Sequence, residues 1–365
     1  MNLVEQLIAS DRDWLSKLET EFKIIVNRTG NLVSLKYDQI ESPMHELIVQ
    51  QCRGMVVDVE GARVLAHPYN KFWNYGDVPA AAIDWSTARV IEKLDGSLMI
   101  LYWHPDEESW IVASSGTPRA TGWYGGNKDE TFADGFWRNW HELGMRQPGA
   151  RYEGRACFMF ELCDAPNRIV VRHERPRIVL HGGRWMDTGE EMSHFELAHA
   201  AAEYGWELVK SFPLTSIEDC LAAANALDPI QCEGFIVVDA RFNRVKIKSP
   251  RYVVLHHMKG EATPRRAIEL WQTGEAGELL SHFPEMAPAI LPVHEKLDLL
   301  ARKAAGIAFG FSHLDRKEFA LRVKGEAFSS VAFKLFGGPA TEADALAFMR
   351  TQSIAALERM VEGAP

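Results

Sequence analysis

The most constraining feature of this sequence is a change in its pattern near residue 258. Up to that point, short apolar runs bounded by turn residues predict strands with a few helices between them. Beyond it, apolar residues recur at helical spacing and predict helices throughout. Because strands and helices of the first part do not alternate strictly, they favour an α+β fold around antiparallel sheet over a doubly wound parallel sheet.

The pattern change and the chain length together predict two domains. A chain of 365 residues exceeds what one hydrophobic core usually holds. We therefore expect an α+β domain over residues 1–258 and an all-helical domain over residues 259–365, with the boundary near Lys259-Gly260. Helices are expected over residues 2–20, 130–144, 193–204, 216–227, 264–282, 289–309, 314–335 and 341–361. Strands are expected over residues 55–59, 63–66, 88–92, 98–103, 110–113, 158–162, 169–171, 177–180, 234–239 and 244–248.

Composition limits the class of protein. The sequence is 47% hydrophobic, which excludes a disordered or collagen-like chain. Its 40 Lys and Arg residues stand against 50 Asp and Glu residues, a balance that argues against non-specific coating of nucleic acid but leaves room for a local basic groove. No run of 18 apolar residues predicts a membrane helix, and the N-terminus lacks the pattern of a signal peptide. The five cysteines form no C-x-x-C pair and are expected to be reduced thiols in a cytoplasmic protein.

The segment Glu92-Lys93-Leu94-Asp95-Gly96 carries the clearest chemical signal. A lysine leaves a predicted strand, Asp-Gly forms a tight turn, and an apolar strand resumes. One interpretation is an ordinary hairpin with an exposed lysine. The other is a nucleophilic lysine, whose pKa must fall from about 10.4 before the amine can attack.

Three further segments place charged residues in apolar strands. Glu161 follows Phe158-Met159-Phe160, and Glu233 precedes Gly234-Phe235-Ile236. Lys246 and Lys248 are two apart and share one face of a strand. Each alone is more often part of a solvated, half-buried strand. Together with Asp95, these carboxylates suit a hydrated Mg²⁺ ion, and paired lysines suit a chain of phosphates.

The order of these motifs resembles a known superfamily. K-x-D-G, F-x-F-E, E-G-F-I-V and K-I-K, in that sequence, are similar to the covalent nucleotidyltransferases, which include ATP-dependent ligases and mRNA capping enzymes. Several local stretches resemble more closely the phage RNA ligase 1 family, the tRNA-repair type: Cys52-Arg53-Gly54-Met55, Asn70-Lys71-Phe72-Trp73-Asn74, Ala165-Pro166-Asn167-Arg168-Ile169-Val170, Lys246-Ile247-Lys248-Ser249 with Tyr252, and Asp315-Arg316-Lys317. The resemblance covers roughly residues 50 to 335 and implies an ATP-grasp-like nucleotidyltransferase domain followed by a helical domain.

The resemblance also implies roles for single residues. Lys93 would form the covalent lysyl-AMP, and Ile236 would pack on adenine. The other nucleotide contacts implied are Arg53 and Lys71 beside the phosphates, Glu92 next to the nucleophile, and Lys246 and Lys248 on the triphosphate. Asp95, Glu161 and Glu233 would bind Mg²⁺ (or Mn²⁺) through waters or orient the ribose.

One departure from the family concerns a lysine that the family carries in the strand after the nucleophile. The matching stretch here is Ala113-Ser114-Ser115-Gly116-Thr117-Pro118-Arg119, with Ser115 where the lysine would be. Either Arg119 compensates for it or one phosphate contact is lost.

The function implied is an ATP-dependent RNA ligase that seals 5′-phosphate and 3′-hydroxyl RNA ends through lysyl-AMP and RNA-adenylate. The implied setting is repair of RNA such as nicked tRNA by a monomer in a bacterial or phage-infected cell. No kinase or phosphatase domain is recognised in the chain, so another protein would heal the ends.

Two alternatives stay open. A DNA ligase or capping enzyme shares only the core motifs and usually carries a β-barrel after the last lysine strand, whereas helices are expected after Lys248. A non-catalytic RNA-end sensor would not need the intact set of charged residues.

Overall fold

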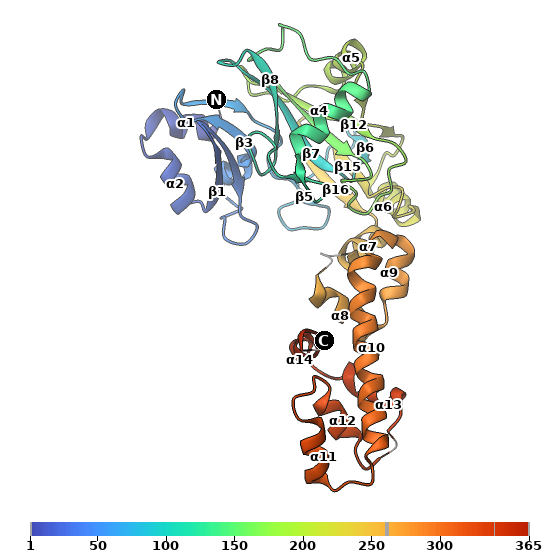
Figure 1. Ribbon diagram of the computed structural model, residues 1–365. Helices are drawn as coiled ribbons and strands as arrows, with labels where there is room; N and C mark the ends of the chain where they lie inside the picture. Colours follow the sequence, from blue (N-terminus) through green and yellow to red (C-terminus); the bar gives the residue numbers. More distant parts are fainter. Residues whose placement is uncertain (1, 260–262, 339, 364–365) are drawn as a thin grey trace. The chain divides into compact units, whose positions relative to one another are not determined.

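The computed structural model describes residues 2–259, 263–338 and 340–363, except the side chains of Met258 and Glu278, and falls into two compact units (Figure 1). The units comprise residues 1–253 and 254–365, so the division lies inside helix α7 (Pro250–Lys259). Of the expected boundary Lys259-Gly260, the second residue lies outside the described residues. The first unit is mixed α+β with antiparallel sheets and the second is helical, as the sequence pattern predicts.

The first unit begins with a small α/β layer. Its four-stranded antiparallel sheet has the order β1-β2-β3-β4 and packs against three helices. The elements are α1 (Leu3–Ser10), α2 (Trp14–Thr20), β1 (Ile24–Thr29), β2 (Leu32–Tyr37), α3 (Leu47–Gln51), β3 (Arg53–Asp58) and β4 (Arg63–Ala66). The single helix expected over residues 2–20 is wrong, because the backbone turns extended at Asp11 and α2 starts afresh. Strands β1 and β2, which the sequence analysis missed, pair across a turn at Gly30.

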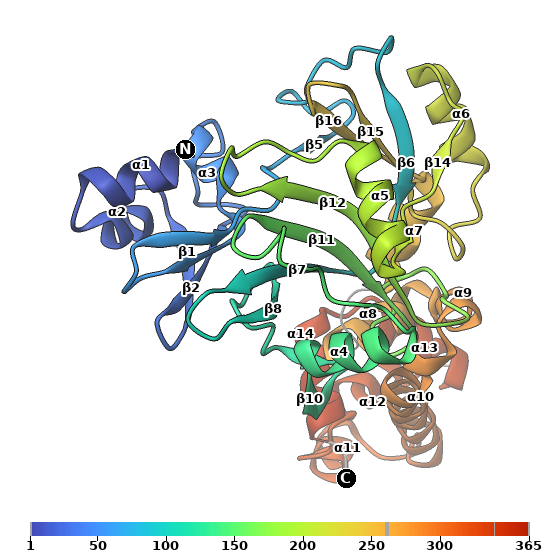
Figure 2. The ribbon, with the colours of Figure 1, turned by 90° about the horizontal axis from the view of Figure 1, so that it is seen from above.

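Two five-stranded sheets form the rest of the unit, and apart from two short parallel pairs, β12–β13 and β16–β5, their strands are antiparallel. The first has the order β13-β12-β11-β7-β8, of which Figure 2 shows β12, β11, β7 and β8 side by side. The second has the order β14-β6-β15-β16-β5. Their strands are β5 (Trp73–Asn74), β6 (Arg89–Lys93), β7 (Ser97–His104), β8 (Ser109–Ser114), β11 (Ala156–Cys163), β12 (Arg177–Trp185), β13 (Glu207–Leu208), β14 (Ser211–Phe212), β15 (Gly234–Val238) and β16 (Arg244–Lys248).

Helices cover the outer faces of these sheets. Helices α4 (Phe132–Glu142) and α5 (His194–Tyr204) share an apolar core with alternate residues of β7, β11 and β12. Helix α6 (Ile217–Ala226) packs on β15 and β16 through Cys220 and Ala224. A small hairpin of β9 (Trp123–Tyr124) and β10 (Asn127–Thr131) precedes α4.

Strand alternation decides which side chains of β11 face inward between the sheets. Phe158, Phe160 and Leu162 point into the core under α4 and α5. Cys157 and Met159 point to the opposite face, and Glu161 continues their row. The strand expected over residues 169–171 does not form, because the amides of Val170 and Val171 donate to the carboxylate of Asp95 instead of to a neighbouring strand.

The second unit packs its helices around the long helix α10. Its elements are α8 (Pro264–Thr273), α9 (Ala276–His282), the 3₁₀ turn η1 (Pro284–Met286), α10 (Ala287–Gly310), α11 (Arg316–Val323), α12 (Ser329–Leu335), α13 (Glu342–Arg350) and α14 (Ile354–Glu362). The helix expected over residues 289–309 is the single helix α10, whereas those expected over 264–282, 314–335 and 341–361 are each divided into two helices. The breaks fall at the left-handed Gly274, at the left-handed Gly325, and at Ser353, which caps α14. Within the described part of the chain, no helix has both the length and the apolar character needed to cross a membrane.

Candidate active site

The turn that carries Lys93 joins the two five-stranded sheets. Strand β6 ends at Lys93 in one sheet, and β7 begins at Ser97 in the other. Because the chain crosses between sheets here, Lys93 lies where the two sheets face each other. Its Nζ is 2.5 Å from Oε2 of Glu233, a carboxylate that is only 3% exposed. The other oxygen of Glu233, Oε1, is 3.0 Å from Nζ of Lys248, so one buried carboxylate bridges two lysines.

Asp95 lies on the far side of this turn and holds it in place. Its Oδ2 accepts hydrogen bonds from the amides of Val170 (2.8 Å) and Val171 (2.7 Å), and its Oδ1 accepts one from the hydroxyl of Tyr252 (2.6 Å). Burial, and then the nearby charges of Glu233 and Asp95, raise the pKa of Tyr252, so this hydroxyl stays a donor. Both oxygens of Asp95 are thus engaged, an arrangement that suits positioning of the turn more than contact with a metal ion.

Gly96 brings the turn against β11. A Cβ on Gly96 would lie 2.4 Å from the carbonyl oxygen of Leu162, so only glycine fits this approach. The amide of Gly96 donates to Oε1 of Glu161 (3.2 Å), and Oε2 of Glu161 lies 3.5 Å from Nε2 of His181. Glu161 is thereby tied to the nucleophile turn on one side and to β12 on the other.

A cavity of about 230 Å³ lies beside Lys93 between the two sheets. It gathers six of the residues predicted to contact the nucleotide or metal: Arg53, Glu92, Lys93, Glu161, Ile236 and Lys246. Its apolar wall includes Ile91 and Leu98. A planar group could lie against the apolar wall of this cavity, and a polyphosphate could bind at its positively charged end.

The positive end of the cavity is built on one aromatic ring. The guanidinium carbon of Arg53 is 5.1 Å, and Nζ of Lys246 4.8 Å, from the centroid of the Phe72 ring. Burial, and after it nearby positive charges, lower the pKa of Lys246 to about 7. Those charges are Arg53, Lys93, Lys71 and Lys248. Repulsion within such a group of cations raises the free energy of the free protein and favours binding of an anion.

Four predicted residues do not line this cavity. Asp95 bonds to Tyr252 behind the nucleophile turn, and Glu233 pairs with Lys93 and Lys248 outside the cavity. Lys71 lines a larger pocket next to it. Arg119 forms an ion pair with Glu107 and lines neither cavity, so the compensation for Ser115 that the sequence left open is not what the structure shows.

Sequence reasoning missed several residues around the cavity. Tyr69, Phe72, His181 and Arg244 all line it. His181 carried the same signal as Glu161, a single polar residue in an apolar strand. Tyr69 donates a hydrogen bond to the carbonyl oxygen of His181 (2.6 Å), and the guanidinium of Arg244 lies 4.3 Å from the centroid of the Tyr69 ring.

The carboxylates do not by themselves make a metal site. Among the residues that the structure describes, no group of three or more His, Cys, Asp or Glu side chains could hold a metal ion. Of the three predicted carboxylates, Glu161 alone lines the cavity. A Mg²⁺ ion, which commonly keeps several waters and binds substrate phosphates through few protein ligands, is compatible with this arrangement.

Comparisons with known proteins agree on one family. A family model described as RNA ligase matches residues 51–252. The RNA ligase of Rhodothermus phage RM378 is 24% identical over 308 residues, covering 68% of this chain and 69% of the relative. A protein of Autographa californica nuclear polyhedrosis virus, described as a bifunctional polynucleotide kinase/RNA ligase, is 26% identical over 298 residues, covering 74% of this chain but only 40% of the viral protein. The solved structure of an archaeal ATP-dependent RNA ligase superposes with a TM-score of 0.50 at 14% identity, covering 79% of this chain and 77% of that one, and shows a shared fold.

Proposed function

This chain belongs to the RNA ligase family, and we propose that it joins the 5′-phosphate end of one RNA to the 3′-hydroxyl end of another at the expense of ATP. One observation carries the proposal. The side chain of Lys93 ends in a cavity that has an apolar slot and a cluster of cations, which is the chemistry of a nucleoside triphosphate site.

In the first step, Nζ of Lys93 attacks the α-phosphorus of ATP, a P–N bond forms, and pyrophosphate leaves. An amine attacks only when unprotonated, and Glu233 at 2.5 Å is placed to take the proton. Arg53 and Lys246 face the departing phosphates. A divalent ion, Mg²⁺ or Mn²⁺, with its water shell held by Glu161, would supply further neutralisation of the phosphate charge.

The next two steps move AMP onto RNA and then release it. An oxygen of the RNA 5′-phosphate attacks the same phosphorus, the P–N bond breaks, and the Lys93 amine leaves with the electron pair and takes up a proton. The 3′-hydroxyl of the second RNA end then attacks the 5′-phosphate, AMP departs, and the hydroxyl proton is lost to solvent or a base. Each displacement needs positioning and charge neutralisation more than covalent help from the protein.

The finer proposals concern substrate and setting. We propose that the RNA is a broken, structured molecule such as nicked tRNA, in a bacterial or phage-infected cell. The viral relative is described as a kinase as well as a ligase, whereas this chain covers 40% of it. We propose that a separate kinase and phosphatase prepare the ends, and that the ligase acts as a monomer.

The test of the proposed function is adenylylation of Lys93. Incubation with α-labelled ATP should leave label on the denatured protein that survives alkali and is released by acid, as a P–N bond requires, and Lys93→Ala should abolish it, because no other lysine occupies the turn between β6 and β7. Lys128→Ala, a change at an exposed lysine on β10, is the matched control and should label normally. Persistent label in Lys93→Ala would refute the mechanism.

A panel of 5′-phosphorylated single-stranded RNA, single-stranded DNA and nicked duplexes separates the alternatives. An RNA ligase joins the RNA substrates preferentially, a DNA ligase joins nicked DNA, and a non-catalytic end sensor retains no covalent AMP.

A further inference from the structure

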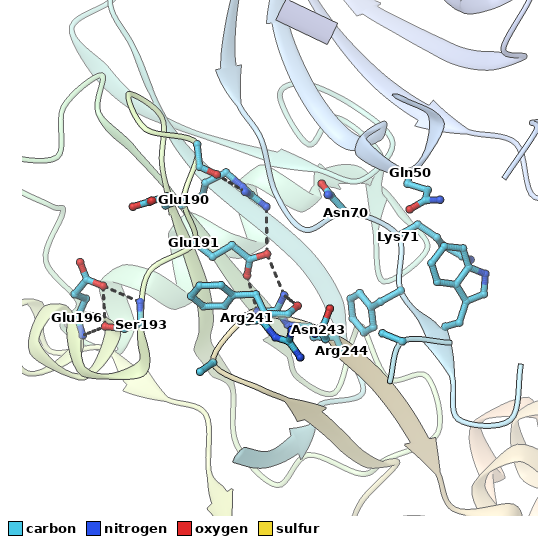
Figure 3. A pocket seen from close by; sticks show the side chains of 17 residues that line it. Gln50, Asn70, Lys71, Glu190, Glu191, Ser193, Glu196, Arg241, Asn243 and Arg244 are labelled. Carbon is cyan, nitrogen blue, oxygen red and sulfur yellow. Dashed lines mark hydrogen bonds and ion pairs between the residues drawn. The ribbon is translucent and has the colours of Figure 1, made fainter. Parts of the chain in front are cut away.

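A second pocket of about 810 Å³ opens beside the nucleotide cavity and shares two residues with it, Phe72 and Arg244. Figure 3 shows Gln50 and Lys71 on one side of this pocket, Ser193 and Glu196 on the other, and Arg241, Asn243 and Arg244 between them. Arg53 and Lys246 both pack on the Phe72 ring, and Phe72 also lines this pocket. The pocket therefore adjoins the cations that are proposed to bind phosphate.

The floor of the pocket is a closed ionic cluster. Glu191 accepts from Arg184 (3.2 Å) and twice from Arg244 (3.0 and 2.5 Å). Arg184 also donates to the carbonyl oxygen of His67, and Glu196 is engaged in the cap of α5. These groups satisfy one another and shape the floor.

The remaining walls offer two cations, aromatic rings and the carboxylate of Glu190. In the described part of the chain, the side chains of Lys71 and Arg241 form no ion pair, although both line the pocket. Trp73 and Phe242 supply rings beside them, whereas the ring of Phe72 already contacts Arg53 and Lys246. Single-stranded nucleic acid binds to sites of this kind, because its phosphates contact cations and its bases stack on aromatic rings.

The turn that carries Arg241 and Asn243 is held in place by hydrogen bonds. Asp239, 3% exposed, accepts from the amides of Asp84, Arg241 and Asn243 and from the side-chain amide of Asn243. The left-handed backbone at Phe242 (φ 63°) completes the turn. The side chain of Arg241 therefore starts from a fixed support, of which the side-chain amide of Asn243 is a part.

We propose that this pocket holds the 5′-terminal nucleoside of the phosphorylated RNA, with its 5′-phosphate directed toward Arg53 and Lys246. The inference rests on the proposed function and on in-line displacement. Pyrophosphate leaves opposite the Lys93 amine, and in the next step the amine itself leaves, so the attacking 5′-phosphate must enter where pyrophosphate departed. The pocket that adjoins that position is the one behind Phe72.

The experiment measures the two RNA ends separately in steady-state sealing. The donor is a nucleoside 3′,5′-bisphosphate, which carries a single nucleoside and a 5′-phosphate, and the acceptor is an oligomer with a 3′-hydroxyl. Arg241→Ala and Asn243→Ala should each raise the KM for the donor, about tenfold for Arg241→Ala, which loses a charged contact. The KM for the acceptor should stay within a factor of about two, since this pocket is assigned to the donor alone.

Arg138→Ala, which removes an exposed arginine from α4 outside the pocket, is the control and should leave both KM values unchanged. Lysyl-AMP formation is measured in parallel. If wild-type protein forms no lysyl-AMP, the proposed function fails. If it forms lysyl-AMP and seals RNA, but Arg241→Ala and Asn243→Ala change neither KM or raise only that of the acceptor, the pocket assignment alone is overturned.

Discussion

At the scale of single residues, the site depends on several cations that are held close together. Lys93 and Lys248 share Glu233, while Lys246 and Arg53 lie on the ring of Phe72. Burial and neighbouring cations lower the pKa of Lys246 to about 7. Near neutral pH, the free protein can therefore relieve its own repulsion by releasing a proton from Lys246.

ATP binding should reverse that release. Polyphosphate charge favours the charged form of Lys246 and raises its pKa, so binding at pH 8 should take up about one proton and should weaken as the pH rises above 7. Calorimetry with α,β-methylene-ATP, which cannot release pyrophosphate, in buffers of different ionisation enthalpy measures this uptake. Lys246→Met should lose it, and equal uptake in both proteins would show that another group titrates.

The support of the nucleophile turn gives a stability prediction. Tyr252→Phe leaves Oδ1 of the buried Asp95 without the 2.6 Å hydrogen bond. Leaving a buried charged acceptor unpaired should lower the free energy of unfolding by about 1–3 kcal/mol. Urea unfolding measures the change, with Tyr75→Phe as the control because Tyr75 is 49% exposed. Equal losses for the two variants would mean that the Asp95 contact does not stabilise the fold.

At the scale of elements, the hairpin of β15 and β16 serves both cavities. Its open end carries Glu233 and Lys248 beside Lys93, and its closed end carries the Asp239 turn beside the outer pocket. Between them, Ile236 and Lys246 are directly opposite across the ladder. The spacing of the two strands therefore sets the distance between the nucleophile and both proposed ligand sites.

Gly234 tests this dependence on strand spacing. Its φ is +151°, and a Cβ there would lie 2.1 Å from the carbonyl oxygen of Ile247. Gly234→Ala must push β15 from β16, so it should cost about 1–3 kcal/mol of unfolding free energy and slow lysyl-AMP formation. Gly306→Ala, in open space on α10, should instead stabilise by about 0.5–1 kcal/mol. Denaturant unfolding and label incorporation compare the two, and a Gly234→Ala protein as stable and active as wild type would contradict the proposed role of the strand spacing.

At the scale of the whole molecule, all the candidate site residues lie in the first unit, and the second unit has a core of its own around α10. Several of its basic residues are occupied: Arg265 and Arg266 pair with Glu269, Arg302 pairs with Glu342, and Arg322 packs on Phe311. In the described residues Lys296, Lys303, Arg316, Lys317, Lys324 and Arg359 form no ion pair and are among the cations available to RNA phosphates.

We propose that the second unit selects structured RNA, and truncation after Lys259 tests this role. The shortened protein should still form lysyl-AMP and join simple single strands, because its site residues remain. It should lose the preference for a nicked stem-loop over a linear oligomer, since phosphate contacts of the second unit would be gone. Competition between the two substrates at fixed salt measures the ratio. An unchanged ratio would assign the unit to support of the fold alone.

The sequence by itself indicated the reaction class through its resemblance to a ligase family, because that resemblance depends on residue types in a fixed order: a lysine on an Asp-Gly turn, lone carboxylates in apolar strands, and paired lysines. Strand alternation was likewise enough to place Lys246 and Lys248 on one face. Helix ends were less predictable, since the breaks at Gly274, Gly325 and Ser353 depend on where the second unit packs around α10. Only the tertiary structure decided which predicted residues reach the nucleotide cavity. Asp95 and Glu161 are both acidic residues of sequence motifs, yet the one bonds the loop behind the turn and the other lines the cavity, because their orientation depends on strands that are distant in the chain.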